Sequence, residues 1–421
     1  MRTEVIIPET WKPKSLGNLC SLLNGFAFKP RDWSSTGTPI IRIQNLNGGM
    51  DFNYYKGPIP TDYEIEPGTL LFAWSGNRGT SFGPFIWKGP KGLLNQHIFK
   101  VFPDNGVNPD WFYFALDDVR QRVERDAHGA IGLVHVRRGE LESYLVLTPE
   151  EAEQKAIARV LQNLDDVIQQ TAVGIEKLKK IKAGLLHDLL TRGIDEKGQL
   201  RDPATHAFIP SPIGLVPTEW NVRTLDGLTD PQAPICYGIV QVGKSVKGGI
   251  LTLAIRDIEG DYQSDIHRTS PLIEAKYTRS RVEPGDLLLS IKGTTGRIAI
   301  VPAGFRGNIS RDLARIRLKA GIVPLFLKFY FQSPMGSRAF DLVTVGTTRK
   351  EISIAPLKKV LVPIPPEKEQ DKIVRFMESQ GIVLEAEKIH LSKLSKLKIG
   401  LMHELLTGRV RVPMKYYGSK P

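Results

Sequence analysis

Two decapeptides contain the residues in this sequence that most resemble a reactive pair. "GLLHDLLTRG" (184–193) and "GLMHELLTGR" (400–409) each place a histidine directly before a carboxylate. Imidazole and carboxylate groups bind metal ions, so an HD-like metal site is one interpretation. The leucines around His187 and His403 recur at helical spacing, which favours a role in helix packing or docking. We therefore predict no metal site.

Other chemical motifs are incomplete. "NPDW" (108–111) is similar to the Asn-Pro-Pro-aromatic motif of adenine methyltransferases, but it lacks the second proline and no glycine-rich cofactor loop accompanies it. "EQK" (153–155) and "EAK" (274–276) contain a nuclease-like tripeptide without the upstream acidic residue that such nucleases need. There is no Walker A motif. The sequence predicts a non-enzymatic protein that binds no cofactor or metal itself.

Composition indicates a folded protein with a polyanionic partner. Apolar residues make up 41% of the chain and charged residues 24%, and the net charge is +12. No apolar run approaches the roughly 20 residues of a membrane span, and the N-terminus lacks the apolar core of a secretory signal. Cys20 and Cys236 are far apart and have no metal-binding spacing. We expect a cytoplasmic protein without membrane partners.

The elements that would position a site occur twice. The matching segments are "IPETWKPKSLGNL" (7–19) with "VPTEWNVRTLDGL" (216–228), "EPGTLLFAWSGNRGT" (66–80) with "EPGDLLLSIKGTTGR" (283–297), and "LESYLVLTPEEAEQKAIARVL" (141–161) with "LKKVLVPIPPEKEQDKIVRFM" (357–377). The two decapeptides close the two repeats. A repeat this long is a duplicated domain and not a solenoid.

Each repeat begins with a globular part and ends with a helical part. Short β-branched and aromatic runs, separated by Gly, Pro and Asn, predict a mainly β domain. Helices are expected within it at 109–125 and 324–341, because both segments open with proline. Beyond Pro149 and Pro365, carboxylates in a first helical turn begin a long proline-free segment.

Both long segments have a heptad pattern, which predicts that they pair with a helix. The positions are Ile157, Leu161, Leu164, Ile168, Thr171, Ile175, Leu178, Lys182, Leu185 and Leu189 in the first, and Ile373, Met377, Gln380, Leu384, Glu387, Leu391, Leu394, Lys398, Leu401 and Leu405 in the second. The second pattern is less apolar and has Gly381 near its middle.

The predicted fold class is α+β, with two mainly β domains, each followed by a long α-helix. We expect the two helices to pair as an antiparallel coiled coil with pseudo-twofold symmetry. The alternative is that each helix folds back on its own β domain. The predicted boundaries are 1–149 for the first β domain, 150–193 for its helix, 194–365 for the second β domain, 366–408 for its helix, and 409–421 for a C-terminal tail.

The sequence resembles the DNA specificity subunit of type I restriction-modification systems. The resemblance covers essentially the whole chain. It is carried by the repeated openings "IPETWKPKSLG" and "VPTEWNVRTL", by "PEEAEQKAIARVLQNLDDVI" and "PPEKEQDKIVRFMESQ", and by the two decapeptides. The second helix departs most from a regular pattern, at Gly381.

The resemblance implies a function and partners. Each β domain would be a target recognition domain that reads one half of a bipartite, asymmetric site in double-stranded DNA. The helices would set the spacing and dock two modification (methyltransferase) subunits, which hold S-adenosylmethionine. Restriction subunits, an ATP- and Mg-dependent translocase and endonuclease, would join them. The chain itself would be non-catalytic.

Polar residues at the ends of predicted strands are the candidates for DNA contact, because Arg and Lys suit guanine, Asn and Gln suit adenine, and phosphate contacts position the protein. For some of them an ordinary tight hairpin is the alternative. The candidates are Arg42, Gln44, Asn45, Ser75, Asn77, Arg78, Asn95, Gln96, His97, His135 and Arg137 in the first repeat, and Arg256, Lys292, Thr294, Thr295, Arg297, Ser310, Arg311, Thr347, Thr348, Arg349 and Lys350 in the second.

Two other functions stay open at this stage. A solitary bivalent DNA-binding regulator would share the architecture but would need no enzymatic partners. A protein–protein scaffold would have an incidental basic charge, and steeply salt-dependent DNA binding would exclude it.

Overall fold

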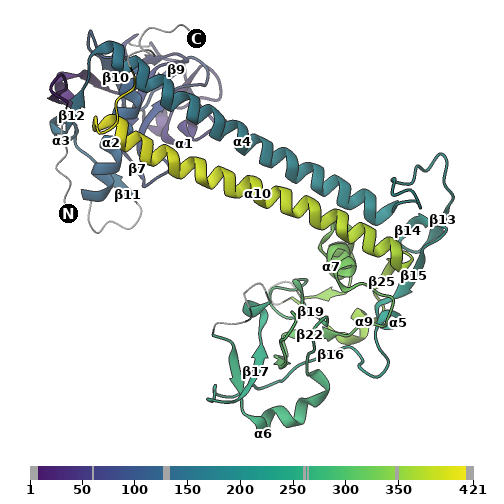
Figure 1. Cartoon of the computed structure of the whole chain (residues 1–421). Helices are drawn as coiled ribbons and strands as arrows, with labels where there is room; N and C mark the ends of the chain where they lie inside the picture. The colour runs from purple at the N-terminus through teal and green to yellow at the C-terminus, as the bar shows by residue number, and fades with distance from the viewer. Residues whose placement is uncertain are drawn as a thin grey trace. The chain divides into compact units, whose positions relative to one another are not determined.

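The chain folds into two compact units. The computed structural model describes residues 8–58, 61–126, 133–258, 262, 265–346 and 350–413. The first unit comprises Met1–Val173 with Ile389–Pro421, and the second comprises Gly174–Lys388 (Figure 1). Residues 389–413 therefore fold with the N-terminal β domain.

The β domain of the first unit is built on two four-stranded sheets. In spatial order they are β2 (Cys20–Asn24), β10 (Ile98–Pro103), β6 (Leu70–Ala73) and β8 (Gly83–Ile86), and then β4 (Asn53–Tyr55), β3 (Thr38–Ile41), β9 (Gly92–Leu94) and β5 (Glu64–Ile65). Pairs β1 (Lys12–Ser15) with β12 (Leu145–Thr148) and β7 (Ser75–Asn77) with β11 (Leu133–His135) complete it. Helix α2 (Pro109–Asp126), at the predicted place, contributes the fully buried Trp111 and Phe112 to the core.

The β domain of the second unit repeats this plan. One sheet contains β16 (Cys236–Tyr237), β22 (Leu313–Ile316), β19 (Leu287–Ser290) and β20 (Ile298–Ile300), and another contains β18 (His267–Thr269), β17 (Ile250–Leu253) and β21 (Asn308–Ile309). The two-stranded pairs are β15 (Asn221–Thr224) with β25 (Leu361–Ile364), β13 (Phe208–Ser211) with β14 (Gly214–Pro217), and β23 (Thr344–Val345) with β24 (Glu351–Ile352). Parallel pairing of β17 with β21 matches that of β3 with β9.

The helix expected at 324–341 is two helices, so that prediction of one continuous helix is wrong. The chain forms α7 (Pro324–Gln332) and α8 (Pro334–Asp341), with Ser333 between them in an extended conformation. Pro334 has no N–H to donate, and the Ser333 hydroxyl instead accepts from the N–H of Gly336 as an N-cap. The break is therefore encoded by the Ser-Pro pair.

Short helical turns connect the strands. They are η1 (Leu16–Asn18), η2 (Pro30–Asp32), α1 (Ile43–Leu46), η3 (Thr61–Tyr63), α3 (Arg138–Ser143), α5 (Leu225–Leu228), η4 (Ile255–Asp257), α6 (Pro271–Glu274), η5 (Ala275–Ser280) and α9 (Ile354–Lys358). No helix of the described residues is long and apolar enough to cross a membrane.

The two long helices are α4 (Glu151–Thr191) and α10 (Glu367–Leu406), of 41 and 40 residues. Every predicted heptad position in both helices is buried or half-buried, whereas most residues between them are exposed. The heptad prediction is therefore confirmed, including the polar positions Lys182 and Lys398. Lys398 keeps its ammonium group satisfied through an ion pair with Asp165 at 2.5 Å.

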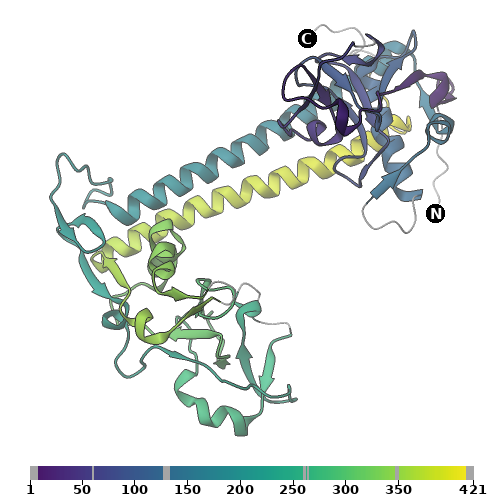
Figure 2. The same ribbon diagram turned by 180° about the vertical axis from the view of Figure 1, so that it is seen from behind.

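The helices pair with each other in antiparallel orientation. In the first unit Leu405 and Leu406, at the end of α10, belong to the same core as Ile157 and Leu161, at the beginning of α4. In the second unit the relation is reversed, with the end of α4 packed on the beginning of α10. Figures 1 and 2 show the two ribbons side by side. This confirms the predicted pairing and excludes the alternative of helices folded back separately.

A buried polar cluster fixes the start of α4. Trp11 Nε1 donates to Glu153 Oε2 at 3.0 Å, and Arg411 Nη2 donates to the same oxygen at 2.7 Å. The neighbouring Gln154 accepts from the backbone N–H of Asn108 and donates to two backbone carbonyls. Trp, Glu and Gln of the repeated sequence thus tie the β domain to its helix.

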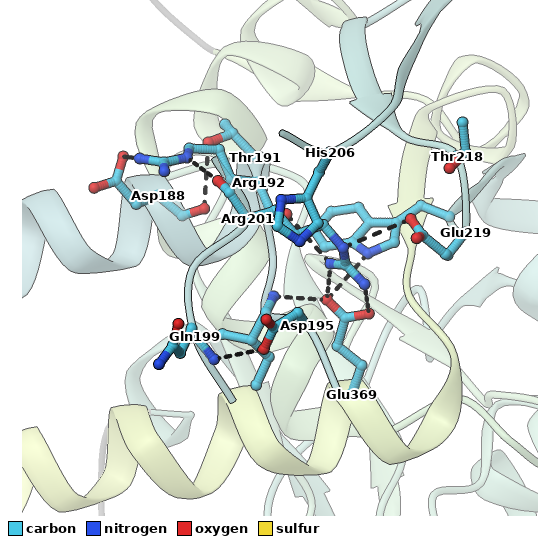
Figure 3. A network of polar contacts seen from close by, with 12 residues as sticks. Asp188, Thr191, Arg192, Asp195, Gln199, Arg201, His206, Thr218, Glu219 and Glu369 are labelled. Atoms are coloured by element: carbon cyan, nitrogen blue, oxygen red, sulfur yellow. Dashed lines mark hydrogen bonds and ion pairs between the residues drawn. The ribbon is translucent and has the colours of Figure 1, made fainter. Parts of the chain in front are cut away.

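The start of α10 carries the same cluster. Trp220 Nε1 donates to Glu369 Oε1 at 3.2 Å, and Arg201 makes bonds of 2.6 and 3.0 Å to the two carboxylate oxygens (Figure 3). Gln370 repeats the three bonds of its counterpart in the first unit. Gly193 follows α4 with φ of 64°, and a Cβ there would overlap the Glu369 carboxylate, so only glycine fits.

The histidines of the decapeptides do not pack in the core. His187 and His403 are exposed, while Leu189 and Leu405 two residues later are buried. The expected packing role is therefore wrong for the imidazoles within this chain, because the buried face of each decapeptide is formed by its leucines. Among the described residues, no three His, Cys, Asp or Glu side chains are grouped to hold a metal ion.

Candidate nucleic-acid interface

Four polar segments of the first β domain lie next to one another at the ends of neighbouring strands. The N–H of Asn95 donates to the carbonyl of Ile41 at 3.0 Å, and the N–H of Trp74 donates to that of His97 at 3.3 Å. The N–H of Val136 then donates to the carbonyl of Trp74 at 3.0 Å. These bonds bring together segments 42–45, 95–97, 74–77 and 135–137, which contain all the candidates of the first repeat except Arg78.

Trp74 is the centre of this polar strip. Its ring lies 5.2 Å from the ring of His97 and 4.9 Å from the ring of His135, measured between centroids. Its Nε1 donates to the carbonyl oxygen of Gln96 at 3.0 Å. The two exposed imidazoles are therefore held beside a half-buried indole. Trp74 was not among the residues expected to contact DNA, although its position directly after an apolar strand and before "SGNRG" could have indicated it.

A cavity of about 200 Å³ lies at one end of the strip. Its lining includes Trp33, Arg42, Gln44 and Gln96. The Arg42 guanidinium lies 5.1 Å from the centroid of the Trp33 ring, and its Nη1 donates to Asn53 Oδ1 at 2.9 Å. An aromatic face with a guanidinium over it and amide groups beside it suits the edge and face of a nucleic-acid base.

One residue that lines this cavity has a side-chain atom without a hydrogen-bond partner within the described part of the chain. The atom is Gln96 Oε1, which is buried from solvent. A buried unpaired carbonyl oxygen costs free energy on the order of 1–3 kcal/mol, so it requires an explanation. A ligand in the cavity would supply the missing partner once the Gln96 side chain turns this buried oxygen toward it.

Two candidate side chains are buried and form hydrogen bonds to nearby backbone groups. Asn45 is only 4% exposed; its Oδ1 accepts from the N–H of Arg42, and its Nδ2 donates to the carbonyls of Gly49 and Asp51. Asn95 is also buried, and its Oδ1 accepts from the N–H of Gln96. Both side chains shape the turns that present their neighbours, so we leave them out of the proposed contact surface.

The second β domain has an equivalent polar strip. The N–H groups of Ser310, Ile291 and Ile352 donate at 2.8 Å to the carbonyls of Leu253, Asp312 and Ile291, respectively. Ile291 thus takes the place of Trp74. These bonds bring together segments 254–257, 290–297, 310–312 and 350–353, which contain the described candidates of the second repeat.

The side chains at this second strip are charged. A cavity of about 370 Å³ is lined by Lys292, Arg311 and Glu351, among others, and Lys292 Nζ lies 3.0 Å from Glu351 Oε1. The Arg256 side chain is 68% exposed, and that of Arg311 is 54% exposed. Both guanidinium groups are therefore accessible to a polyanion.

The remaining candidates occupy the loop tips or lie outside the described residues. Asn77, Arg78, Arg137, Thr294, Arg297 and Lys350 are exposed, while Ser75 and Thr295 are half-buried. Ser310 is buried, and its Oγ has no hydrogen-bond partner within the described residues. Thr347, Thr348 and Arg349 lie outside the described residues.

Comparison with known proteins places the chain in a family. A sequence model described as the type I restriction modification DNA specificity domain matches residues 8–180 and 245–395. The chain belongs to the type I restriction-modification DNA specificity family. Members of this family recognise DNA sequence, which agrees with two polar strips on a basic protein.

Individual relatives align with most of the chain. The chain is 30% identical over 384 residues to the type I restriction enzyme EcoBI specificity subunit of Escherichia coli, covering 88% of this chain and 79% of that protein. It is 24% identical over 423 residues to the putative type I restriction enzyme MjaX specificity subunit of Methanocaldococcus jannaschii, covering 96% and 95%. The relatives are specificity subunits, which are non-catalytic.

Solved structures share the fold. A chain from work on complex assembly and conformational transition of the type I R-M system has a TM-score of 0.61 at 16% identity, over 96% of this chain and 99% of that one. The type I restriction-modification S subunit from M. genitalium has a TM-score of 0.50 at 15% identity, over 96% and 98%. The resemblance seen in the sequence is thereby confirmed.

Proposed function

We propose that each β domain of this specificity protein reads one half of a bipartite, asymmetric site in double-stranded DNA. The proposal assigns residues 1–149 and 194–365 to two target recognition domains, 150–193 and 366–408 to spacer helices, and 409–421 to a tail. The observation that carries it is the duplication of the polar strip, built on the same backbone bonds in both domains but with different side chains. Two readers with different side chains would recognise an asymmetric site.

The antiparallel helices would set the gap between the half-sites and dock the partner subunits. Exposed apolar residues on both helices are consistent with a docking role, because apolar surface that gathers into a patch marks an interaction site. Examples are Val173 on α4 and Ile382 and Ile399 on α10, which are 63%, 71% and 59% exposed.

The partners proposed are two modification subunits with S-adenosylmethionine and restriction subunits with ATP and Mg, in the cytoplasm. The described part of the chain offers no metal cluster, and its sequence contains no nucleotide-binding motif, so these cofactors would belong to the partners. The chain would contribute sequence recognition and assembly, with no catalytic residue of its own.

A selection experiment tests this proposal. The full chain, purified with its methyltransferase partner, is incubated with a library of random 40-base-pair duplexes, and the bound DNA is sequenced. We expect two short constant elements separated by a gap of fixed length and no fixed sequence. One continuous element, or no enriched element, would contradict bipartite reading.

A solitary bivalent regulator is the second candidate, favoured only by the presence of two polar strips in one chain. Affinity purification of the full chain from its native cells separates the two functions. Retention of a methyltransferase supports the specificity subunit, whereas a lone chain that binds DNA supports the regulator. DNA binding that does not weaken as salt is raised from 50 to 200 mM would contradict both, since phosphate contacts release counterions.

A further inference from the structure

We infer that residues 44 and 96 of the first domain and residues 256 and 311 of the second are equivalent base-reading positions. On this basis, two glutamines read an A·T base pair in one half-site, and two arginines read a G·C base pair in the other. The inference rests on the proposed function, and it adds the residues that determine specificity and the base that each domain selects.

The backbone establishes that positions 96 and 311 are equivalent. Each follows the strand of a parallel pair, β9 beside β3 and β21 beside β17. In both domains the residue just after that strand, Asn95 or Ser310, donates its N–H to the last carbonyl of the partner strand, at 3.0 and 2.8 Å. Residues 96 and 311 come next in the chain, so they leave the two sheets at the same point.

A pair of glycines supports the same correspondence. A Cβ at Gly25 would overlap the carbonyl oxygens of Leu94 and Asn95, and a Cβ at Gly238 would overlap that of Ile309, which ends its strand as Leu94 does. Only glycine permits this close approach, which occurs directly before residue 96 in one domain and close before residue 311 in the other. Residues 96 and 311 therefore both follow a close contact between two backbone segments, which restricts how the chain can move there.

Positions 44 and 256 are equivalent in the turn that follows β3 or β17. The N–H of Arg42 donates to Asn45 Oδ1 at 2.9 Å, and the N–H of Ala254 donates to Asp257 Oδ2 at 2.7 Å. In each turn the capping side chain is buried, and the residue before it is exposed. That exposed residue is a glutamine in the first domain and Arg256 in the second.

The two glutamines face one cavity. Gln44 and Gln96 both line the 200 Å³ cavity described above. Gln96 Oε1 is buried without a partner in the described residues, and its Nε2 has a long contact of 3.4 Å to His97. Gln44 Nε2 likewise makes only a long contact of 3.4 Å, to the carbonyl of Asp51. The amide groups retain capacity for a ligand.

Adenine has the complementary edge. It presents an amino group that donates and a ring nitrogen that accepts, so one carboxamide can bind it through two hydrogen bonds. After a rotation of the Gln96 side chain that opens its buried Oε1 to the cavity, this oxygen would accept from the amino group, and Nε2 would donate to the ring nitrogen. Guanine presents two acceptors at that edge and cannot satisfy a carbonyl oxygen.

The two arginines have the opposite preference. A guanidinium only donates, and two of its N–H groups match the two acceptors of guanine. Arg311 Nε lies 3.9 Å from Asp312. Arg256 is held more firmly, by a contact of 3.4 Å from its Nε to Asp257 and by a hydrogen bond of 3.0 Å from its Nη2 to the backbone carbonyl of Asp265. Such contacts orient the side chains and leave N–H groups available to a base.

The test uses the duplex selection on single-residue variants. Gln96→Arg should convert one A·T preference in the first half-site to G·C, by roughly 10- to 100-fold, which is the discrimination of one bidentate contact. The reciprocal Arg311→Gln should convert G·C to A·T in the second half-site by a similar factor. In each variant the other half-site and the gap should stay unchanged.

The control is Gln170→Arg, which makes the same charge change at an exposed position of α4. It should leave both half-sites unchanged. Because arginine is larger than glutamine, Gln96→Arg could fail to fold, and thermal unfolding would reveal this. Gln96→Glu, which keeps the shape and removes the amide donor, then decides: it should abolish the A·T preference in the folded protein.

The outcomes separate the inference from the proposed function. A wild-type chain that selects a bipartite site, together with folded variants at 96 and 311 that select the same bases as wild type, would overturn the inference alone. The absence of any bipartite site for wild type would instead overturn the proposed function.

Discussion

Arg411 and Glu153, 258 positions apart in the chain, are joined by two hydrogen bonds, one of them 2.7 Å between Nη2 and Oε2. Arg201 and Glu369 form the matching pair in the second unit. In each unit the arginine comes from the segment that follows one long helix, and the glutamate begins the other. The segment that follows each long helix is therefore bound to the first turn of the other long helix, and the local sequence does not reveal this pairing.

Replacement of the two glutamates should lower the free energy of unfolding. Glu369→Gln removes the charge facing Arg201, whose side chain is 6% exposed, so we expect a loss of about 2–4 kcal/mol in the free energy of unfolding. Glu153→Gln faces Arg411, whose side chain is 44% exposed, so solvent should limit the loss to about 1–2 kcal/mol. Urea unfolding followed by tryptophan fluorescence measures both.

Glu219→Gln is the control for these variants. Glu219 is 51% exposed, and its carboxylate makes a long contact of 3.6 Å with Arg201. Its replacement should therefore cost less than about 1 kcal/mol. Equal stability of all three variants and the wild-type protein would show that the clusters contribute no net stability.

Trp74 is expected to support DNA binding by the first β domain only. Trp74→Ala removes the ring between His97 and His135 and the bond to the Gln96 carbonyl, so affinity for the first half-site should fall about tenfold. Phe102→Ala, which removes an exposed aromatic ring elsewhere in the same unit, is the control. Competition between duplexes that lack one or the other half-site measures the change. A loss confined to the second half-site would refute the assignment.

Glu274 should make the second unit sensitive to acid. Hydrogen bonds from Arg281 Nε and Nη2, at 2.7 and 2.8 Å, lower the pKa of its carboxyl group below the ordinary value, and a bond from Asn308 adds to this. A lowered folded-state pKa stabilises the fold above the unfolded-state pKa, and this stability is lost as the pH falls through the folded-state value. Glu274→Gln should therefore be less stable than wild type by about 1–2 kcal/mol at pH 7.

The difference between Glu274→Gln and wild type should shrink as the pH falls below the ordinary glutamate pKa of about 4.3, because the carboxyl then binds a proton in the unfolded state before it does in the folded state. Thermal unfolding of both proteins from pH 7 to pH 3 measures it. A difference that is the same at every pH would show that shape, and not charge, determines the effect.

Cys20 should react slowly while the protein is folded. It is 3% exposed, and burial raises the pKa of its thiol to about 12, so almost none is thiolate at pH 8. We expect maleimide labelling of Cys20 to be at least about 100-fold slower in buffer than in urea, as measured by mass spectrometry of the peptides. Labelling at equal rates would mean that the first unit opens readily.

The heptad pattern allows a test of the helices as a spacer. Insertion of seven residues into both helices, after residue 170 of α4 and after residue 386 of α10, keeps the buried face in register. It adds about 10 Å, so the gap between half-sites should grow by roughly three base pairs. The same insertion in α4 alone is the control, and it should destabilise the pair. An unchanged gap with both insertions would rule out the spacer role.

The sequence allowed prediction of the features that depend on local periodicity. The buried positions of the long helices follow from the spacing of apolar residues, and the duplicated plan follows from the matching segments of the two repeats. Lys182 and Lys398 were identified on the buried face because the pattern continues through them, and α2 was found from its initial proline.

Features that depend on which contacts a side chain makes in the folded chain could not be predicted. Asn45 resembles an exposed reader in sequence, yet three bonds to its own turn bury it. The role of Trp74 depends on His97 and His135 reaching it from other strands. The helix at 324–341 was expected from its initial proline, and the Ser333–Pro334 break within it was not considered. The reading positions 256 and 311 could be matched to 44 and 96 only once the strand pairing was known.

Methylation mapping after exchange of one β domain tests the central claim most directly. Residues 8–149 are replaced by the corresponding domain of another family member, and methylated adenines are mapped in DNA from cells with the partner subunits. We predict that the first half-site changes while the second half-site and the gap stay as in wild type. A change in both half-sites, or in neither, would contradict independent reading by the two domains.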